Sequence, residues 1–134
     1  MPNIQKISHV AVAVNDIEKA LCFWRDALGM NLSELRDVPG EKSQVAFLPV
    51  GGSEIELVRP TADNSGLARF LAKRGPGMHH ICLEVDDLNA MLAQLKEKSI
   101  RLINASPLIA VDGKRYAFIH PESSDGVLVE LYQI

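Results

Sequence analysis

The chain has 134 residues, of which 47% are hydrophobic and 23% are charged, the balance of a globular domain. That length accommodates one domain with a hydrophobic core and is too short for two independent domains. The formal net charge of −3, and the lack of an apolar run near the ~20 residues that cross a bilayer, argue against nucleic-acid and membrane partners.

The first half of the chain has the pattern of one strand, one helix and three further strands. Valine-rich residues 7–14 predict a buried strand. Asn15, with Glu18 three positions on, predicts a capped helix start, and Gly29 predicts the helix end. The apolar residues at helical spacing are Ile17, Ala20, Leu21, Trp24 and Leu28. Turn residues then separate strand-like segments near 30–38, 43–50 and 53–59, which completes a βαβββ module.

The second half repeats this pattern. The predicted elements are a strand over 79–85, a helix over 87–98, and strands near 100–104, 114–120 and 126–133. Between the halves, Ser65 is expected to cap a short helix that runs to Arg74. Each module alone has about 60 residues and is marginal for independent stability. We therefore expect one α+β domain over 1–134, built from tandem βαβββ modules at 5–60 and 77–134 with a linker at 61–76.

The two modules are related by a sequence repeat. Residues 9–17 align with residues 80–88 at an offset of 71, and the same offset carries residues 46–48 onto 117–119. Three extra residues in the second copy then bring Glu56-Leu57 onto Glu130-Leu131. Two copies paired about a pseudo-twofold axis would bring two histidines, His9 and His80, and both glutamates into a single cleft. Histidine with carboxylate is a donor set that divalent metals bind, so the repeat predicts a metal site.

Strand alternation supports this hypothesis. It places His9 on the same face as two small alanines, and His80 on the same face as Cys82 and Glu84. The alternative is that Glu56 and Glu130 face water on one-sided sheets, as is common in antiparallel sheets. The recurrence of both glutamates at equivalent places beside histidines favours the metal site.

Two further histidines compete as ligands. His79 precedes His80 and should therefore point to the opposite face of its strand. His120 precedes Pro121 at a strand end, where a turn, a substrate contact or a structural role are all open. We predict neither as a ligand.

Three cations, Arg69, Lys73 and Arg74, lie in the linker helix and near its end. The ordinary interpretation is a solvated C-terminal turn that suits the helix dipole, and phosphate binding is the alternative.

The two cysteines indicate whether the protein is expected in a reducing or an oxidising compartment. Cys22 falls in a predicted helix and Cys82 in a predicted strand, and the two form no CxxC motif. We expect both to be reduced, packed thiols. The N-terminal residues lack the apolar stretch of a signal peptide, so the expected location is cytoplasmic.

An ordered set of motifs resembles the vicinal oxygen chelate superfamily, which includes glyoxalase I, extradiol dioxygenases and antibiotic-resistance proteins. Within it, the chain is most similar to the methylmalonyl-CoA epimerases. The segments that carry the resemblance are 45–51, 54–57, 67–75, 77–81, 84–87, 120–121 and 126–131. The resemblance implies metal ligands at His9, Glu56, His80 and Glu130. Val45 stands where some bacterial epimerases carry a glutamate that acts as a base.

The resemblance also implies a chemistry. It implies proton abstraction at the α-carbon of methylmalonyl-CoA, with Glu130 as one base and Glu56 as the leading candidate for the other. It implies one divalent metal ion, Co²⁺ first, with Mn²⁺, Ni²⁺ or Zn²⁺ as alternatives. The expected partners are a small acyl-CoA substrate and a second copy of the chain in a homodimer.

Two alternative functions stay open at this point. One is a glyoxalase I-like lactoylglutathione lyase, against which the resemblance of residues 73–80 argues. The other is a non-enzymatic, metal-free protein that sequesters small molecules. Retention of all four ligand-type residues argues against that second alternative.

Overall fold

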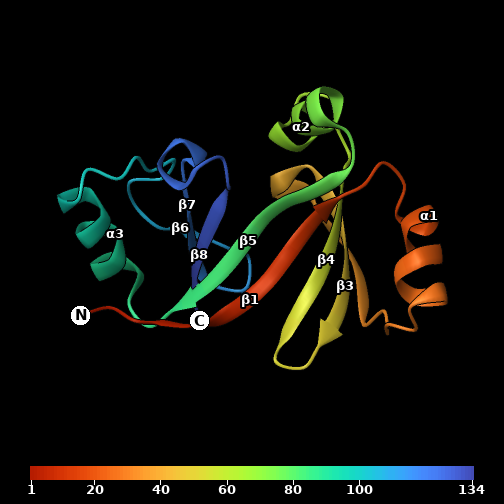
Figure 1. The fold of residues 1–134 in the computed structure, drawn as a ribbon, viewed down its shortest axis with the longest axis horizontal. Helices are drawn as coiled ribbons and strands as arrows, with labels where there is room; N and C mark the ends of the chain where they lie inside the picture. The colour runs from red at the N-terminus through yellow and green to blue at the C-terminus, as the bar shows by residue number, and fades with distance from the viewer. The chain divides into compact units, whose positions relative to one another are not determined.

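The computed structural model describes residues 1–134 and divides into two compact units. The central unit is His9–His79, and the split unit combines Met1–Ser8 with His80–Ile134. Figure 1 labels the strands β1 (Ile4–Ala13) and β5 (Gly77–Val85). Each of them begins in one unit and ends in the other. The chain therefore passes from one unit to the other in the middle of these strands. No helix has the length and apolar character needed to cross a membrane.

The central unit contains a sheet with strand order β2-β3-β4-β1. Strands β1 and β4 pair in parallel, whereas β2 with β3 and β3 with β4 pair antiparallel. Beyond β1, its elements are α1 (Ile17–Leu21), a π-helix (Cys22–Ala27), β2 (Glu34–Val38), a 3₁₀-helix (Pro39–Glu41), β3 (Ser43–Val50), β4 (Ser53–Pro60) and α2 (Gly66–Arg74). Ser65 caps α2 as predicted, because its side-chain oxygen accepts from the Ala68 N–H at 3.1 Å.

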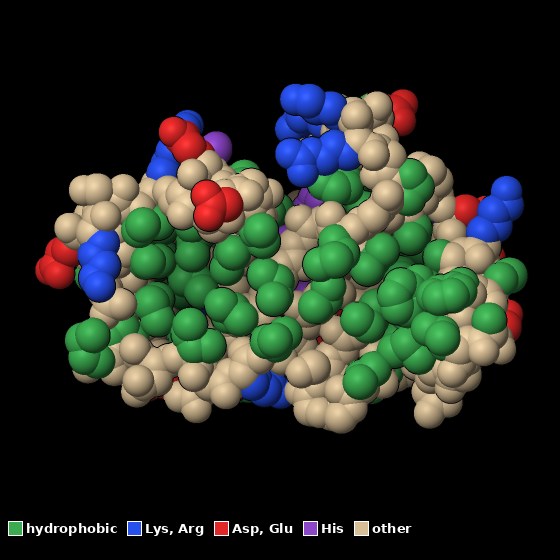
Figure 2. Space-filling view, viewed as in Figure 1, with side chains coloured by type: hydrophobic (Ala, Val, Ile, Leu, Met, Phe, Trp, Pro, Cys, Tyr) green, Lys and Arg blue, Asp and Glu red, His purple; other side chains and the backbone are tan.

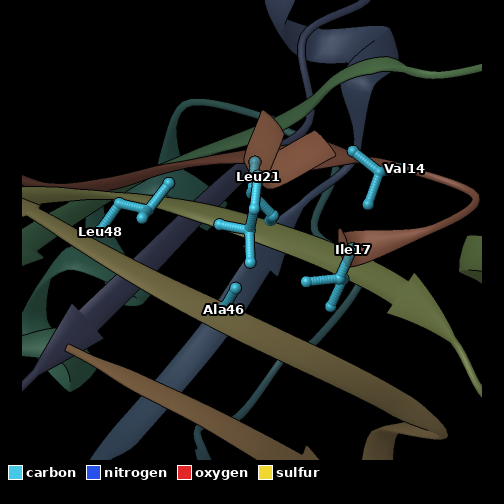
Figure 3. Packing of buried hydrophobic residues seen from close by; sticks show 6 residues of the cluster. Val14, Ile17, Leu21, Ala46 and Leu48 are labelled. Carbon is cyan, nitrogen blue, oxygen red and sulfur yellow. The ribbon is translucent and has the colours of Figure 1, made fainter. Parts of the chain in front are cut away.

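Each face of this sheet packs against its own helix. On one face, α1 and the preceding loop bury a cluster that Figure 3 shows from close by, made of Val14, Ile17, Leu21, Ala46, Leu48 and Leu57. On the other face, α2 packs over Ala11, Ala13, Val45 and Val58. The period-two alternation of β1 and β4 separates these two sets. The face under α2 is the face that also carries His9 and Glu56.

The split unit has the corresponding arrangement, with strand order β5-β8-β7-β6. Its β5–β8 pair is parallel, like β1–β4, and its other pairs are antiparallel. Beyond β5, its elements are α3 (Leu88–Glu97), β6 (Leu108–Ile109), β7 (Arg115–Ile119), a 3₁₀-helix (Pro121–Ser124) and β8 (Val129–Gln133). The core residues are Val85, Leu88, Met91, Leu92, Ala117 and Leu131. The N-terminal segment is tied to this unit, because the Asn3 N–H donates to Asp86 Oδ1 at 2.8 Å.

The first helix differs from its prediction. Its N-cap is Asp16, whose carboxylate accepts from the Lys19 N–H at 3.2 Å, and not Asn15 in a capping box with Glu18. The helix then widens to a π-helix, and Cys22 is exposed there instead of packed. Cys22 lies about 100° around the helix from Leu21, off the apolar stripe, which explains its exposure. Cys82 is buried and unbridged, as predicted.

The strand predicted near 100–104 is reduced to a single bridge between Leu102 and Ile119. A side chain is the reason. The Asn104 Oδ1 accepts from the Phe118 N–H at 2.9 Å, and the Ile103 and Asn104 N–H groups both donate to the same Phe118 carbonyl. These contacts replace a regular ladder. The two-residue strand β6 was not predicted.

Candidate functional site

The central unit holds a histidine–carboxylate pair between its parallel strands. Residue Ala11 of β1 lies opposite Glu56 of β4, which places Glu56 diagonally across from His9. The His9 Nδ1 and the Glu56 Oε2 are 3.0 Å apart, and their side chains are only 11% and 13% exposed. The pair is therefore largely withdrawn from water.

The split unit holds a matching pair. Cys82 of β5 lies opposite Glu130 of β8, so Glu130 stands diagonally across from His80 by the same register rule. The His80 Nε2 and the Glu130 Oε1 are 3.0 Å apart, with side chains 11% and 12% exposed. The sequence repeat is thus reproduced in strand register, distance and burial.

Phenylalanines repeat beside the glutamates as well. Phe47 lies opposite Glu56 in the β3–β4 pair, and Phe118 lies opposite Glu130 in the β7–β8 pair. The Phe118 ring also meets the His80 ring edge to face at 5.6 Å. An apolar ring next to a carboxylate lowers the local dielectric, which strengthens electrostatic interactions at that carboxylate.

The donor chemistry of each pair fits a divalent cation. A metal bound at ~2.0–2.2 Å from an imidazole nitrogen and from a carboxylate oxygen holds neighbouring ligands roughly 3 Å apart when they subtend a right angle. The observed separations of 3.0 Å are hydrogen-bond distances between imidazole and carboxylate, and they are also short enough for both atoms to become neighbouring ligands of one ion. Imidazole with carboxylate suits several first-row divalent ions, so the donor set does not select one of them.

Cys82 lies beside the second pair. The sequence analysis predicted a packed thiol at Cys82 and did not predict this proximity. Its Sγ lies within 4.8 Å of a carboxylate oxygen of Glu130, and the residue is buried. Strand alternation carried the signal, because Cys82 shares the face of His80.

The competing histidines have other contacts. The His79 ring packs edge to face against the Phe70 ring of α2 at 4.8 Å, within the central unit. The His120 Nδ1 accepts from the Glu122 N–H at 3.0 Å and so caps the 3₁₀-helix over Pro121–Ser124. The sequence left a turn, a substrate contact and a structural role open for His120, and the structure shows a structural role as this helix cap.

Val45 lies in the apolar cluster beneath α2 and is only 5% exposed. A carboxylate at this buried position would need a partner to offset its desolvation. The side chain here cannot exchange a proton, so any second base of the central unit must come from another residue.

Comparison with known proteins identifies the family of the chain. The profile of the Glyoxalase/Bleomycin resistance protein/Dioxygenase superfamily matches residues 8–118. The mitochondrial methylmalonyl-CoA epimerase of Homo sapiens is 42% identical over 132 residues, which span 98% of this chain and 75% of that protein. An ethylmalonyl-CoA/methylmalonyl-CoA epimerase of Cereibacter sphaeroides is 38% identical, with 98% and 99% of the two chains covered.

A solved structure is similar as well. It is a Streptomyces coelicolor methylmalonyl-CoA epimerase variant in complex with 2-nitronate-propionyl-CoA. The TM-score is 0.90 at 28% identity, over 98% of this chain and 95% of that one. The α+β fold class and the family resemblance predicted from the sequence are confirmed. The chain therefore belongs to the glyoxalase/bleomycin resistance protein/dioxygenase superfamily and, within it, to the methylmalonyl-CoA epimerase family.

Proposed function

We propose that this protein interconverts the (R) and (S) epimers of methylmalonyl-CoA by moving a proton at the α-carbon. The observation that carries the proposal is the equivalence of the two histidine–glutamate pairs, His9 with Glu56 and His80 with Glu130, each at 3.0 Å. A reaction that removes a proton from one face of a carbon and returns one to the other face needs two exchangeable groups. Membership of the epimerase family supports the same substrate.

We propose further that His9, Glu56, His80 and Glu130 together hold one divalent cation, with Co²⁺ first and Mn²⁺, Ni²⁺ or Zn²⁺ as alternatives. When bound, the ion would supply electrostatic stabilisation, worth several kcal/mol, for the negative charge that develops as the α-proton leaves. The donor chemistry and spacing of each pair support this assignment. The resemblance to the epimerase family implies a single ion for the four residues.

The two glutamates divide the proton transfer. In one direction the Glu130 carboxylate takes the α-proton and becomes a carboxylic acid, which leaves an enolate on the substrate. The Glu56 carboxyl gives its proton to the opposite face of the α-carbon and becomes a carboxylate. The reverse direction exchanges the two roles, and proton exchange with water resets the enzyme. General acid–base groups of this kind typically contribute ~10²–10⁴-fold to the rate.

In the metal-free protein, each histidine orients its glutamate. An imidazole nitrogen 3.0 Å from a carboxylate oxygen fixes that oxygen in place. The low exposure of both pairs excludes most competing water, which strengthens every charge interaction there. The histidines therefore determine the direction from which each carboxyl meets the α-carbon.

The test is incubation of metal-loaded protein with each epimer of methylmalonyl-CoA in deuterated water. Epimerisation with deuterium wash-in at the α-carbon is the expected result, followed by proton NMR or mass spectrometry. Methylglyoxal with glutathione is assayed beside it, because a glyoxalase I-like lyase would form the lactoyl thioester there. Activity on that adduct without α-proton exchange in methylmalonyl-CoA would contradict the proposal.

A further inference from the structure

Helix α2 carries an exposed cluster of cations, made of Arg69, Lys73 and Arg74 and called here the α2 basic cluster. Figure 2 shows Lys and Arg side chains gathered over this helix. The Arg74 guanidinium lies over the Phe70 ring at 5.6 Å from its centroid, which keeps one cation beside the helix surface. In a chain of net charge −3, a local concentration of positive charge is a distinct feature.

These cations differ from others of the chain in their surroundings. Several other arginines and lysines contact an acidic side chain, namely Arg25 with Asp26, Arg36 with Glu34, Arg101 with Glu122 and Lys114 with Asp112. No carboxylate lies within 4.0 Å of the charged groups of Arg69, Lys73 or Arg74. The three charges are therefore not neutralised by the protein, and an anion would find them available.

The α2 basic cluster belongs to a helix that packs on the sheet face of His9 and Glu56. Leu67, Phe70 and Leu71 of α2 cover Ala11 and Ala13 on that face. His9 lies on that same face, two residues before Ala11, or roughly 7 Å along the strand. Helix α2 therefore packs on the same sheet face as His9, starting two residues further along β1.

A role in the helix dipole explains only part of the cluster. Lys73 and Arg74 lie in the last turn of α2, where cations interact favourably with the C-terminal partial charge. Arg69 is the fourth residue of the helix and lies one turn before Lys73, outside the range of that effect. The helix dipole therefore does not account for Arg69.

We infer that the α2 basic cluster binds the phosphates of the coenzyme A part of the substrate, an inference that rests on the proposed function. Coenzyme A carries a diphosphate and a 3′-phosphate, whose charge matches three clustered cations. Arginine and lysine are the side chains that recognise phosphate, the first by paired N–H groups and the second as a point charge. The cluster would then hold the nucleotide while the thioester end lies at the histidine–glutamate pairs.

The direct test is binding of free coenzyme A, measured by calorimetry with metal-free protein. The test variant is Arg69→Gln/Lys73→Gln, which leaves the packed Arg74 in place. The matched control is Lys96→Gln/Lys98→Gln, which removes the same charge at α3, a helix that packs against Leu83 and Val85 on the face opposite His80. The dissociation constant is expected to rise about 5- to 30-fold in the test variant only. Equal affinity in all three proteins would overturn the inference.

A kinetic test separates this inference from the proposed function. The measured quantity is the ratio of kcat/KM for methylmalonyl-CoA to kcat/KM for methylmalonyl-pantetheine, which lacks the phosphates. The test variant is expected to lower this ratio about 5- to 30-fold. A general structural defect would lower both values and leave the ratio unchanged, which would contradict the inference. If the unaltered protein epimerises neither thioester but loses coenzyme A affinity with Arg69→Gln/Lys73→Gln, the proposed function fails and the phosphate site stands.

Discussion

Replacement of Glu130 by glutamine tests whether this residue acts as a base, because it should remove the base and preserve the fold and the bound metal. In the metal-free protein, the glutamine carbonyl oxygen can still accept from the His80 ring at the observed 3.0 Å. An amide oxygen can also ligate a metal, but an amide cannot take up a proton as a carboxylate does. The contact changes from a charge-assisted to a neutral hydrogen bond, a loss of about 1 kcal/mol of folding free energy, or about 4 °C in Tm. Loss of the base lowers turnover at least ~10²-fold, or about 2.7 kcal/mol in activation free energy.

Deuterium wash-in from each epimer is measured together with metal content and thermal unfolding. Glu130→Gln is expected to keep most of its metal and its fold while its turnover collapses. The control is Glu97→Gln, which removes the same charge from an exposed position on α3 and should leave all three measurements unchanged. This combination excludes unfolding and metal loss as the cause of lost activity.

Glu56→Gln is the informative companion variant. If Glu56 is the second base, proton exchange survives from one epimer and collapses from the other. If it is a ligand alone, turnover falls modestly and equally from both epimers. Undiminished epimerisation by the double variant Glu130→Gln/Glu56→Gln would refute the two-glutamate mechanism.

Three further predictions concern metal, core and pH. His80→Ala should lose bound metal and stay folded, while His79→Ala should keep it, because adjacent strand residues point to opposite faces; elemental analysis of both proteins decides this. Leu21→Ala removes a fully buried side chain and should lower the free energy of unfolding by about 2–5 kcal/mol in urea titrations. The Asn3 N–H holds the pKa of Asp86 below its ordinary value, so this stabilisation is present above the unfolded pKa and is lost as pH falls through the lower folded one. When the pH is lowered below about 4, the urea midpoint of the unaltered protein should therefore decrease more than that of Asp86→Asn.

Each of these has a contrary outcome. Metal loss in His79→Ala with retention in His80→Ala would show that the wrong face of β5 had been assigned to the site. A change below about 1 kcal/mol for Leu21→Ala would mean that the α1 cluster collapses around the deletion. Parallel acid profiles for the unaltered protein and Asp86→Asn would show that the Asn3 contact does not persist in solution.

Local patterns predicted most elements and failed where side chains compete with the backbone. The helix over Leu88–Glu97 and the capped helix from Gly66 follow from periodicity and from Ser65, signals that lie within a few residues. The prediction of a strand near 100–104 was wrong, because the Asn104 side-chain amide replaces backbone hydrogen bonds that a regular strand would make with β7. That competition depends on Phe118, fourteen residues away, which no local pattern includes.

By itself the sequence determined the repeat, and the repeat determined which residues are equivalent: His9 with His80 and Glu56 with Glu130. Period-two alternation also determined their faces, because it follows from strand geometry alone. Only the tertiary structure decided that β1 and β5 pair in parallel with β4 and β8, which brings each histidine to 3.0 Å from a glutamate some 50 residues away in the chain. Register between distant strands is set by packing over the whole sheet, and this information is not present in either strand.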